Sequence, residues 1–108
     1  MEAMTKWVRV GSVADVPEDG MGHSVTIDGQ DIALFQWDQT FYALENLCPH
    51  LGFPLTEGIA QDGNIICGWH GWRIRLEDGS CQGKTLTAPT FPCEVRGDDL
   101  YLKIPVLP

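Results

Sequence analysis

Two short loops, each carrying one cysteine and one histidine, constrain the fold of this 108-residue chain more than any other feature of its sequence. The first loop reads "CPHLG" and contains Cys48 and His50, and the second reads "CGWHG" and contains Cys67 and His70. Sixteen residues separate the two pairs, which gives the pattern C-x-H-x16-C-x2-H. Each loop therefore offers one thiolate and one imidazole, and the four side chains together form a candidate metal site.

Two kinds of metal centre are compatible with two cysteines and two histidines. One is a structural zinc ion in Cys2His2 coordination. The other is a [2Fe–2S] cluster with both cysteines on one iron and both histidines on the other. Familiar zinc patterns group cysteine with cysteine and histidine with histidine, whereas each pair is mixed here. The pattern therefore favours the cluster, with a zinc module or four unrelated residues as the alternatives.

Short runs rich in β-branched and aromatic residues, separated by turn residues, fill most of the chain. Asp28-Gly29 and Gly97-Asp98 are typical of hairpin turns, and no stretch shows clean helical periodicity. The sequence therefore predicts an all-β sandwich or barrel. The predicted strands are 6–10, 23–27, 31–37, 40–44, 64–68, 72–76, 92–97 and 99–104, with a helical turn between 12 and 22.

The formal net charge of −8, from 15 acidic and 7 basic residues, argues against a nucleic acid partner. It is compatible with docking onto a basic protein face, or with a role in solubility alone. The sequence shows no secretory signal and no segment apolar enough to span a membrane. We therefore expect a cytoplasmic protein whose four cysteines are reduced, with no membrane partner.

The stretch "CPHLGFPLTEG" followed by "CGWHGW" resembles the cluster motif of Rieske-type [2Fe–2S] ferredoxins from bacterial ring-hydroxylating oxygenase systems. It is also similar to the small-subunit family of assimilatory nitrite reductases. The resemblance implies a single Rieske domain over 1–108, with a six-stranded antiparallel barrel-like base and an inserted cluster-binding subdomain at about 46–82. It also implies one [2Fe–2S] cluster, with Cys48 and Cys67 on one iron and His50 and His70 on the other.

The function implied by this resemblance is one-electron transfer from a flavin reductase to a terminal oxygenase, without an organic substrate and without catalysis by the chain itself. The alternative within redox chemistry is a small subunit bound to the large subunit of a nitrite reductase. Two ferric ions, two sulfides and two thiolates make the oxidised cluster neutral when the imidazoles are neutral. Four thiolates would leave it doubly negative, so histidine ligation raises the reduction potential.

Residues beside the ligands predict where this potential lies. Respiratory Rieske proteins carry an extra cysteine in each loop and a serine after the second "HG", whereas this chain has Phe53, Trp69 and Trp72 there. Without that disulfide and that hydroxyl donor, we expect a potential at the low end of the family's range. Cys81 and Cys93 lie outside the motif, and we expect both to be small buried residues, with a disulfide between them or a redox-sensing role as the alternatives.

Overall fold

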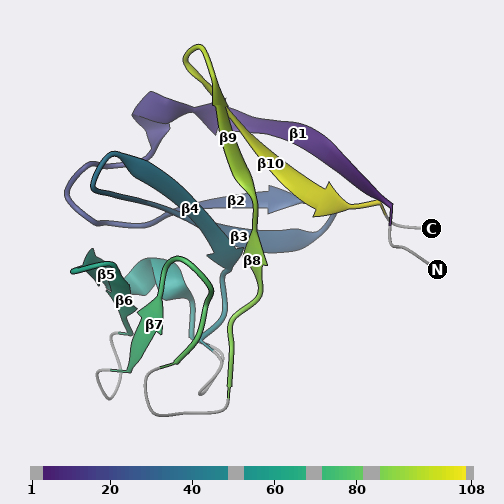
Figure 1. The fold of residues 1–108 in the computed structure, drawn as a ribbon. Helices are drawn as coiled ribbons and strands as arrows, with labels where there is room; N and C mark the ends of the chain where they lie inside the picture. The colour runs from purple at the N-terminus through teal and green to yellow at the C-terminus, as the bar shows by residue number, and fades with distance from the viewer. Residues whose placement is uncertain (1–3, 49–52, 68–71, 82–85, 107–108) are drawn as a thin grey trace.

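The computed structural model describes residues 4–48, 53–67, 72–81 and 86–106 (Figure 1). Within these residues the chain forms ten strands and two short 3-10 helices, and no α-helix. In chain order the elements are β1 (Thr5–Ser12), η1 (Val13–Asp15), β2 (His23–Ile27), β3 (Gln30–Trp37), β4 (Thr40–Glu45), η2 (Leu55–Glu57), β5 (Ile59–Gln61), β6 (Asn64–Ile66), β7 (Arg73–Arg75), β8 (Thr90–Phe91), β9 (Cys93–Arg96) and β10 (Asp99–Pro105).

The strands form three antiparallel sheets. The order is β1-β10-β9 in the first, β2-β3-β4-β8 in the second and β5-β6-β7 in the third. In Figure 1 the first two sheets lie together in the upper part of the molecule, and the small third sheet lies below them. We refer to the first two sheets as the base.

Strand β3 is buried on both faces and contributes side chains to two separate cores. Ile32 and Leu34 pack with Leu100 and Leu102 of β10 in the core between the two base sheets. Ala33 and Phe35, which point to the opposite face, belong to a second core that the third sheet helps to form. A continuous apolar run is the sequence signature of a strand that is buried on both sides, and the run "IALF" follows that rule.

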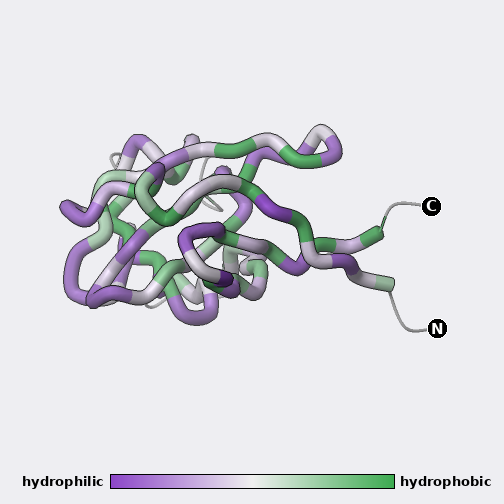
Figure 2. Tube along the Cα trace, turned by 90° about the horizontal axis from the view of Figure 1, so that it is seen from above, coloured by the Kyte–Doolittle hydropathy of each residue, from purple (hydrophilic) through white to green (hydrophobic). Residues whose placement is uncertain are grey.

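Two-residue turns set the register of the hairpins. Asp28 and Gly29 join β2 to β3, and Asp62 and Gly63 join β5 to β6; all four residues have positive φ angles between 52° and 79°. Asp-Gly suits such turns because glycine adopts positive φ without strain and aspartate tolerates it. Figure 2 shows hydrophilic colouring at several peripheral turns of the trace, as expected for turns in contact with water.

The expected all-β architecture is confirmed, with three differences in detail. The base contains seven strands in two open sheets, where six strands in a barrel-like arrangement were expected. Strands β5 and β8 were not predicted, and the strand predicted over 64–68 ends at Ile66. The helical turn expected between 12 and 22 is η1. The division of the single domain into a base and a cluster-binding part at about 46–82 stays a prediction.

Candidate metal centre

The first ligand loop, residues 48–53, begins just after β4. The N–H of Leu47 donates to the carbonyl of Glu45 at 2.8 Å, which turns the chain sharply away from the sheet. The N–H of Cys48 then donates to the carbonyl of Phe53 at 2.6 Å. This bond closes the loop at its base, and η2 follows directly after Pro54.

The second ligand loop, residues 67–72, lies at the end of the β6–β7 hairpin. The last pair of that ladder is Ile66 with Arg73, and the N–H of Cys67 donates to the carbonyl of Trp72 at 2.9 Å. The bond continues the hairpin pairing by one position. The alternation predicted for 72–76 is confirmed, because Ile74 and Leu76 are buried while Arg73 is exposed.

The two loops are closed in the same way. In each, the N–H of the cysteine binds the carbonyl of the residue five positions later. Cys48 and Cys67 are 1% and 3% exposed and belong to the same buried core, against which Phe53 and Trp72 also pack. All four cysteines of the chain are free. The structure therefore brings together the two predicted thiol ligands, while His50 and His70 lie outside the described residues.

One glycine links the two loops. Gly58 ends η2, just after the first ligand loop, and a Cβ atom built on it would overlap the carbonyl oxygen of Ile66. Ile66 immediately precedes Cys67. The absence of a side chain at residue 58 therefore lets the exit of the first loop lie directly against the entry of the second.

A third cysteine shares the core of the two predicted thiol ligands. Cys81 is in the same core as Cys48 and Cys67, and burial raises the pKa of its thiol, with the nearby Cys48 sulfur raising that pKa further. Burial also raises the pKa of Cys93, to about 12. Cys81 is buried as predicted, Cys93 is half-buried, and the alternative of a disulfide between them is wrong because both are free.

Sequence reasoning missed two residues of this region. Gly58 was noted only as a loop residue, and Asn46 was not singled out, although it is the only buried polar residue in the part of the chain that the structure describes. Both act through groups that are distant in sequence, so no local pattern marks them. The sequence feature that could have drawn attention to Asn46 is its position two residues before the predicted ligand Cys48.

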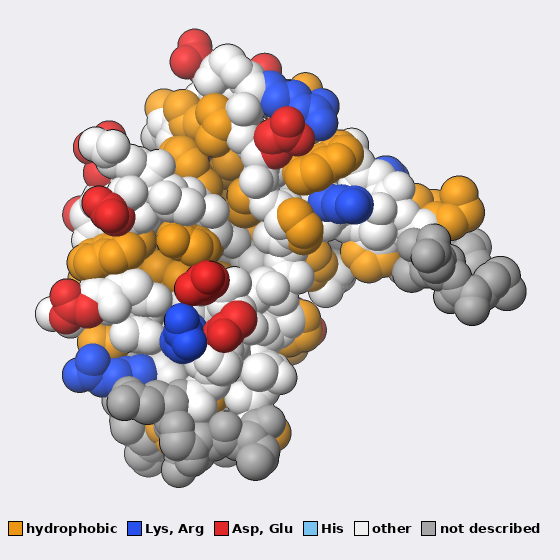
Figure 3. Space-filling model, in the orientation of Figure 1, with side chains coloured by type: hydrophobic (Ala, Val, Ile, Leu, Met, Phe, Trp, Pro, Cys, Tyr) orange, Lys and Arg blue, Asp and Glu red, His pale blue; other side chains and the backbone are white. Residues whose placement is uncertain are grey.

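Acidic side chains dominate the surface charge. Of the seven lysines and arginines, Lys84 lies outside the described residues, and four of the other six pair with carboxylates. These ion pairs join exposed groups and contribute little to stability. Most of the 15 acids are therefore not neutralised, and Figure 3 shows red side chains spread over the visible face.

Comparison with known proteins decides which metal centre the loops belong to. The family model described as the Rieske [2Fe-2S] domain matches residues 6–100, a range that includes both loops. The chain belongs to the Rieske [2Fe–2S] domain family. Its prosthetic group is therefore a [2Fe–2S] cluster, and the zinc alternative is not supported.

Among curated relatives, this Rieske domain is similar to the "Naphthalene 1,2-dioxygenase system, ferredoxin component" of Pseudomonas putida. The two are 31% identical over 97 residues, which cover 83% of this chain and 88% of the relative. Full-length similarity of this kind shows that ferredoxin components of oxygenase systems are homologues of the chain.

Two solved structures share the fold. A protein assigned as the NADH-dependent nitrite reductase small subunit of Mycobacterium tuberculosis has a TM-score of 0.86, with 22% identity over 96% of this chain and 99% of that one. The other is a chain from the complex of reduced oxygenase and oxidised ferredoxin in carbazole 1,9a-dioxygenase. It has a TM-score of 0.78, with 26% identity over 89% of this chain and 91% of that one.

The residues that the structure describes fit a Rieske cluster. Two free thiols lie in one buried core at the bases of two loops with matching closure, as thiolate ligands to a single iron require. The core also excludes water from the cysteine side of the site, because both thiols are almost fully buried. Among the described residues, no helix is both long and apolar enough to cross a membrane.

Proposed function

We propose that this protein is a one-electron carrier that takes electrons from a flavin reductase and passes them to a terminal oxygenase. The observation that carries the proposal is the pair of matching loop closures, which hold two free buried thiols in one core within a Rieske domain. When bound, a [2Fe–2S] cluster supplies reversible transfer of one electron. The chain itself performs no further chemistry in this proposal and acts in the cytoplasm.

In this proposal Cys48 and Cys67 bind one iron, and His50 and His70 bind the other. The buried thiols hold the inner side of the cluster, so the histidine side is the route for electrons to and from partners. The chain's own contribution is to exclude water around the cysteines through Phe53 and Trp72. We also keep the single domain over 1–108, with its cluster-binding part at about 46–82, as part of the proposal.

Two observations support protein partners of this kind. The homologous ferredoxin components belong to oxygenase systems, and the matched carbazole dioxygenase ferredoxin was solved in complex with its oxygenase. The unneutralised acidic surface is suited to a basic docking face, because complementary charge speeds protein encounters. A flavin reductase as the donor is our inference from the same systems.

Metal and redox analysis of the purified protein tests the proposal. We expect a red-brown protein with two irons and two acid-labile sulfides per chain, which bleaches on reduction. A potentiometric titration should give a potential at the low end of the roughly −150 to +300 mV range of Rieske centres. A potential near the top of this range would contradict the argument from Phe53, Trp69 and Trp72, and a colourless protein would contradict the proposal itself.

The alternative is a small subunit of a nitrite reductase, bound to the large subunit. The structural similarity to such a subunit shows a shared fold at 22% identity and does not choose between the two functions. Gel filtration of a pull-down from the native host separates them. A stable complex of fixed stoichiometry favours the subunit, whereas a carrier elutes alone and reduces an oxygenase in a reconstituted assay.

A further inference from the structure

Asn46 occupies the junction between the base and the first ligand loop. It follows β4 directly, and its backbone N–H donates to the carbonyl of Asp31 at 3.0 Å, one position beyond the β3–β4 pair of Ile32 and Glu45. Its side chain is 3% exposed. Burying an amide is costly unless its donors and acceptor are all satisfied, so the contacts of this side chain explain why it is tolerated.

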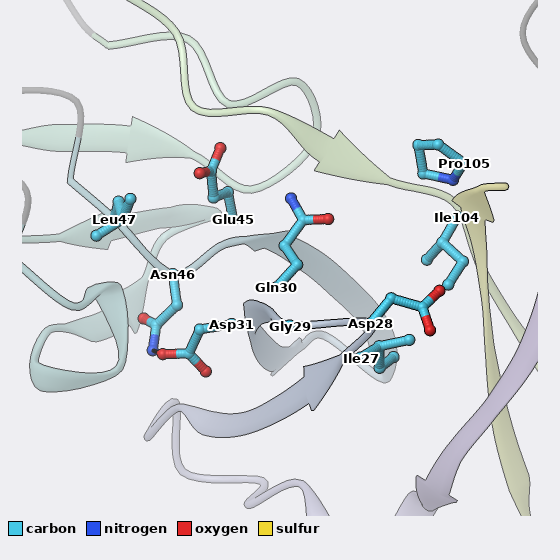
Figure 4. A pocket seen from close by; sticks show the side chains of 10 residues that line it. All are labelled: Ile27, Asp28, Gly29, Gln30, Asp31, Glu45, Asn46, Leu47, Ile104 and Pro105. Carbon is cyan, nitrogen blue, oxygen red and sulfur yellow. Dashed lines mark hydrogen bonds between the residues drawn. The ribbon is translucent and has the colours of Figure 1, made fainter. Parts of the chain in front are cut away.

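The Asn46 side chain joins three segments of the chain. Its Oδ1 accepts the backbone N–H of Thr56 at 3.0 Å. Its Nδ2 donates to the Asp31 carboxylate at 2.9 Å and to the Thr56 hydroxyl at 3.3 Å. The orientation of the amide is fixed, because a backbone N–H only donates and must face the oxygen. Figure 4 shows the Asn46 amide nitrogen facing the Asp31 carboxylate at the edge of a cavity of about 470 Å³.

These bonds hold both ends of the first ligand loop. The backbone of Asn46 fixes the entry of the loop to β3, and its side chain fixes the exit through Thr56 of η2. The bond from Cys48 to Phe53 lies inside this pair. The Asn46 side chain thus supplies the outer cross-link of the loop, at a position where a hairpin would use a backbone pair.

We propose that Asn46 is a positioning residue for the cluster, which fixes the first ligand loop on the base, and that the Asp31 carboxylate orients its amide. This inference rests on the proposed role of Cys48 as a ligand. An apolar residue at position 46 would leave the half-buried Thr56 N–H without its acceptor, which adds a desolvation cost to the loss of the bond itself. Loss of the cross-link frees η2 and the loop exit relative to Cys48.

An exchange of the two polar groups tests the proposal. In Asn46→Asp, a second carboxylate faces that of Asp31 across the former 2.9 Å hydrogen bond, so like charges repel. In the double variant Asp31→Asn/Asn46→Asp, the amide and the carboxylate change places. The new carboxylate accepts from the Thr56 N–H as before. Its bonds to position 31 and to the Thr56 hydroxyl can be remade with reversed polarity, because the new amide and the hydroxyl both donate.

The matched control is Asn64→Asp. Asn64 begins β6, three residues before Cys67, and its Nδ2 donates to the carbonyl of Asp62 of the adjacent turn in an exposed hydrogen bond of 3.2 Å. The chemical change and the distance in sequence from a ligand cysteine are therefore similar, but no cross-link between segments is lost. Each variant is purified as the loaded protein, and the wild type must first show two irons and two sulfides.

Three measurements separate positioning from general stability. They are the rate of iron loss to a chelator, the line width of the electron paramagnetic resonance signal of the reduced protein, and the thermal midpoint from far-ultraviolet circular dichroism. For Asn46→Asp we expect iron loss about tenfold faster, as expected for losing one hydrogen bond to a charged group. We also expect broader resonance lines, because the ligand loop then samples several geometries.

The exchange variant should restore both cluster readouts to near wild-type values, and Asn64→Asp should leave them unchanged. Wild-type line width and iron loss in Asn46→Asp would overturn the inference, as would failure of the exchange variant to restore them. If Asn46→Asp does not fold, the exchange variant alone decides, since only a loaded protein with wild-type lines supports the inference. A wild type without iron and sulfide overturns the proposed function itself.

Discussion

The two ligand loops have the same closure but different supports. The second loop ends a β-hairpin whose three ladder pairs run from Asn64 with Arg75 to Ile66 with Arg73, so the backbone pairing of a hairpin supports both of its ends. The first loop leaves the base after β4, and the cross-link from its exit back to its entry, outside the Cys48–Phe53 bond, comes from the side chain of Asn46. Backbone pairing depends little on side-chain identity, whereas an amide cross-link depends on one residue. The first loop should therefore be the more sensitive of the two to substitution at its base.

Replacing a predicted ligand cysteine should have the largest effect on the cluster, and the effect should be the same for either loop. In Cys48→Ser and in Cys67→Ser we expect loss of the cluster, because a single iron would lose one of its two thiolates. Iron and sulfide analysis with the visible spectrum measures the loss. Cys93→Ser is the control, since Cys93 lies on β9 in the base. A loaded, coloured Cys48→Ser protein would contradict the ligand assignment for the first loop.

Gly58→Ala tests the contact between the loops and has an intermediate expected effect. The added Cβ would overlap the Ile66 carbonyl, so the first loop's exit and the second loop's entry must move apart. We expect a loss of about 1–3 kcal/mol in unfolding free energy, as for overpacked core positions, measured by denaturant titration of the loaded protein.

The control for this variant is Gly29→Ala, where the added Cβ meets no atom within 4 Å but the φ angle is +79°. It separates backbone strain from overlap, because strain alone should lower stability without changing iron loss. If Gly58→Ala releases iron at the wild-type rate, the two loops are not coupled through this contact.

Acid should slightly weaken the turn at Asp78 and Ser80, which follows β7, and this is the smallest expected effect. The Ser80 hydroxyl, followed by the Ser80 backbone N–H, lowers the pKa of Asp78 below its ordinary value of 3.8. Since the folded-state pKa is the lower one, the stabilisation is present above about pH 4 and is lost as the pH falls through the folded-state value. Thermal unfolding followed from about pH 5 downward, through the lowered pKa of Asp78, should show a steeper loss for wild type than for Asp78→Asn. Equal slopes would show that the Asp78–Ser80 bonds add nothing to the stability of the protein.

The all-β class, the hairpin turns and the two candidate loops could be predicted from the sequence, because the signals for each of them are local. The mixed cysteine and histidine pairs, the Asp-Gly turns and the alternation over 72–76 each lie within a few residues. Strand β5 is only three residues long and was missed, although the Asp62-Gly63 turn indicates a strand on both sides. The role of Asn46 was not predictable, because asparagine is usually a turn residue and its partners lie 15 and 10 positions away.

The double burial of β3 limits how the molecule can be recombined with its relatives. Strands β4 and β8 are neighbours through Leu44 and Thr90, so the chain leaves the base after β4 and returns to it at the adjacent strand β8. The predicted cluster-binding part, at about 46–82, therefore looks exchangeable as a cassette. Yet Ala33 and Phe35 of the base lie in the same core as Cys48 and Cys67. A chimera that exchanges the cassette must therefore also carry the donor's residues at positions 33 and 35. Otherwise the two cysteines of the cassette will pack against side chains that belong to a different core.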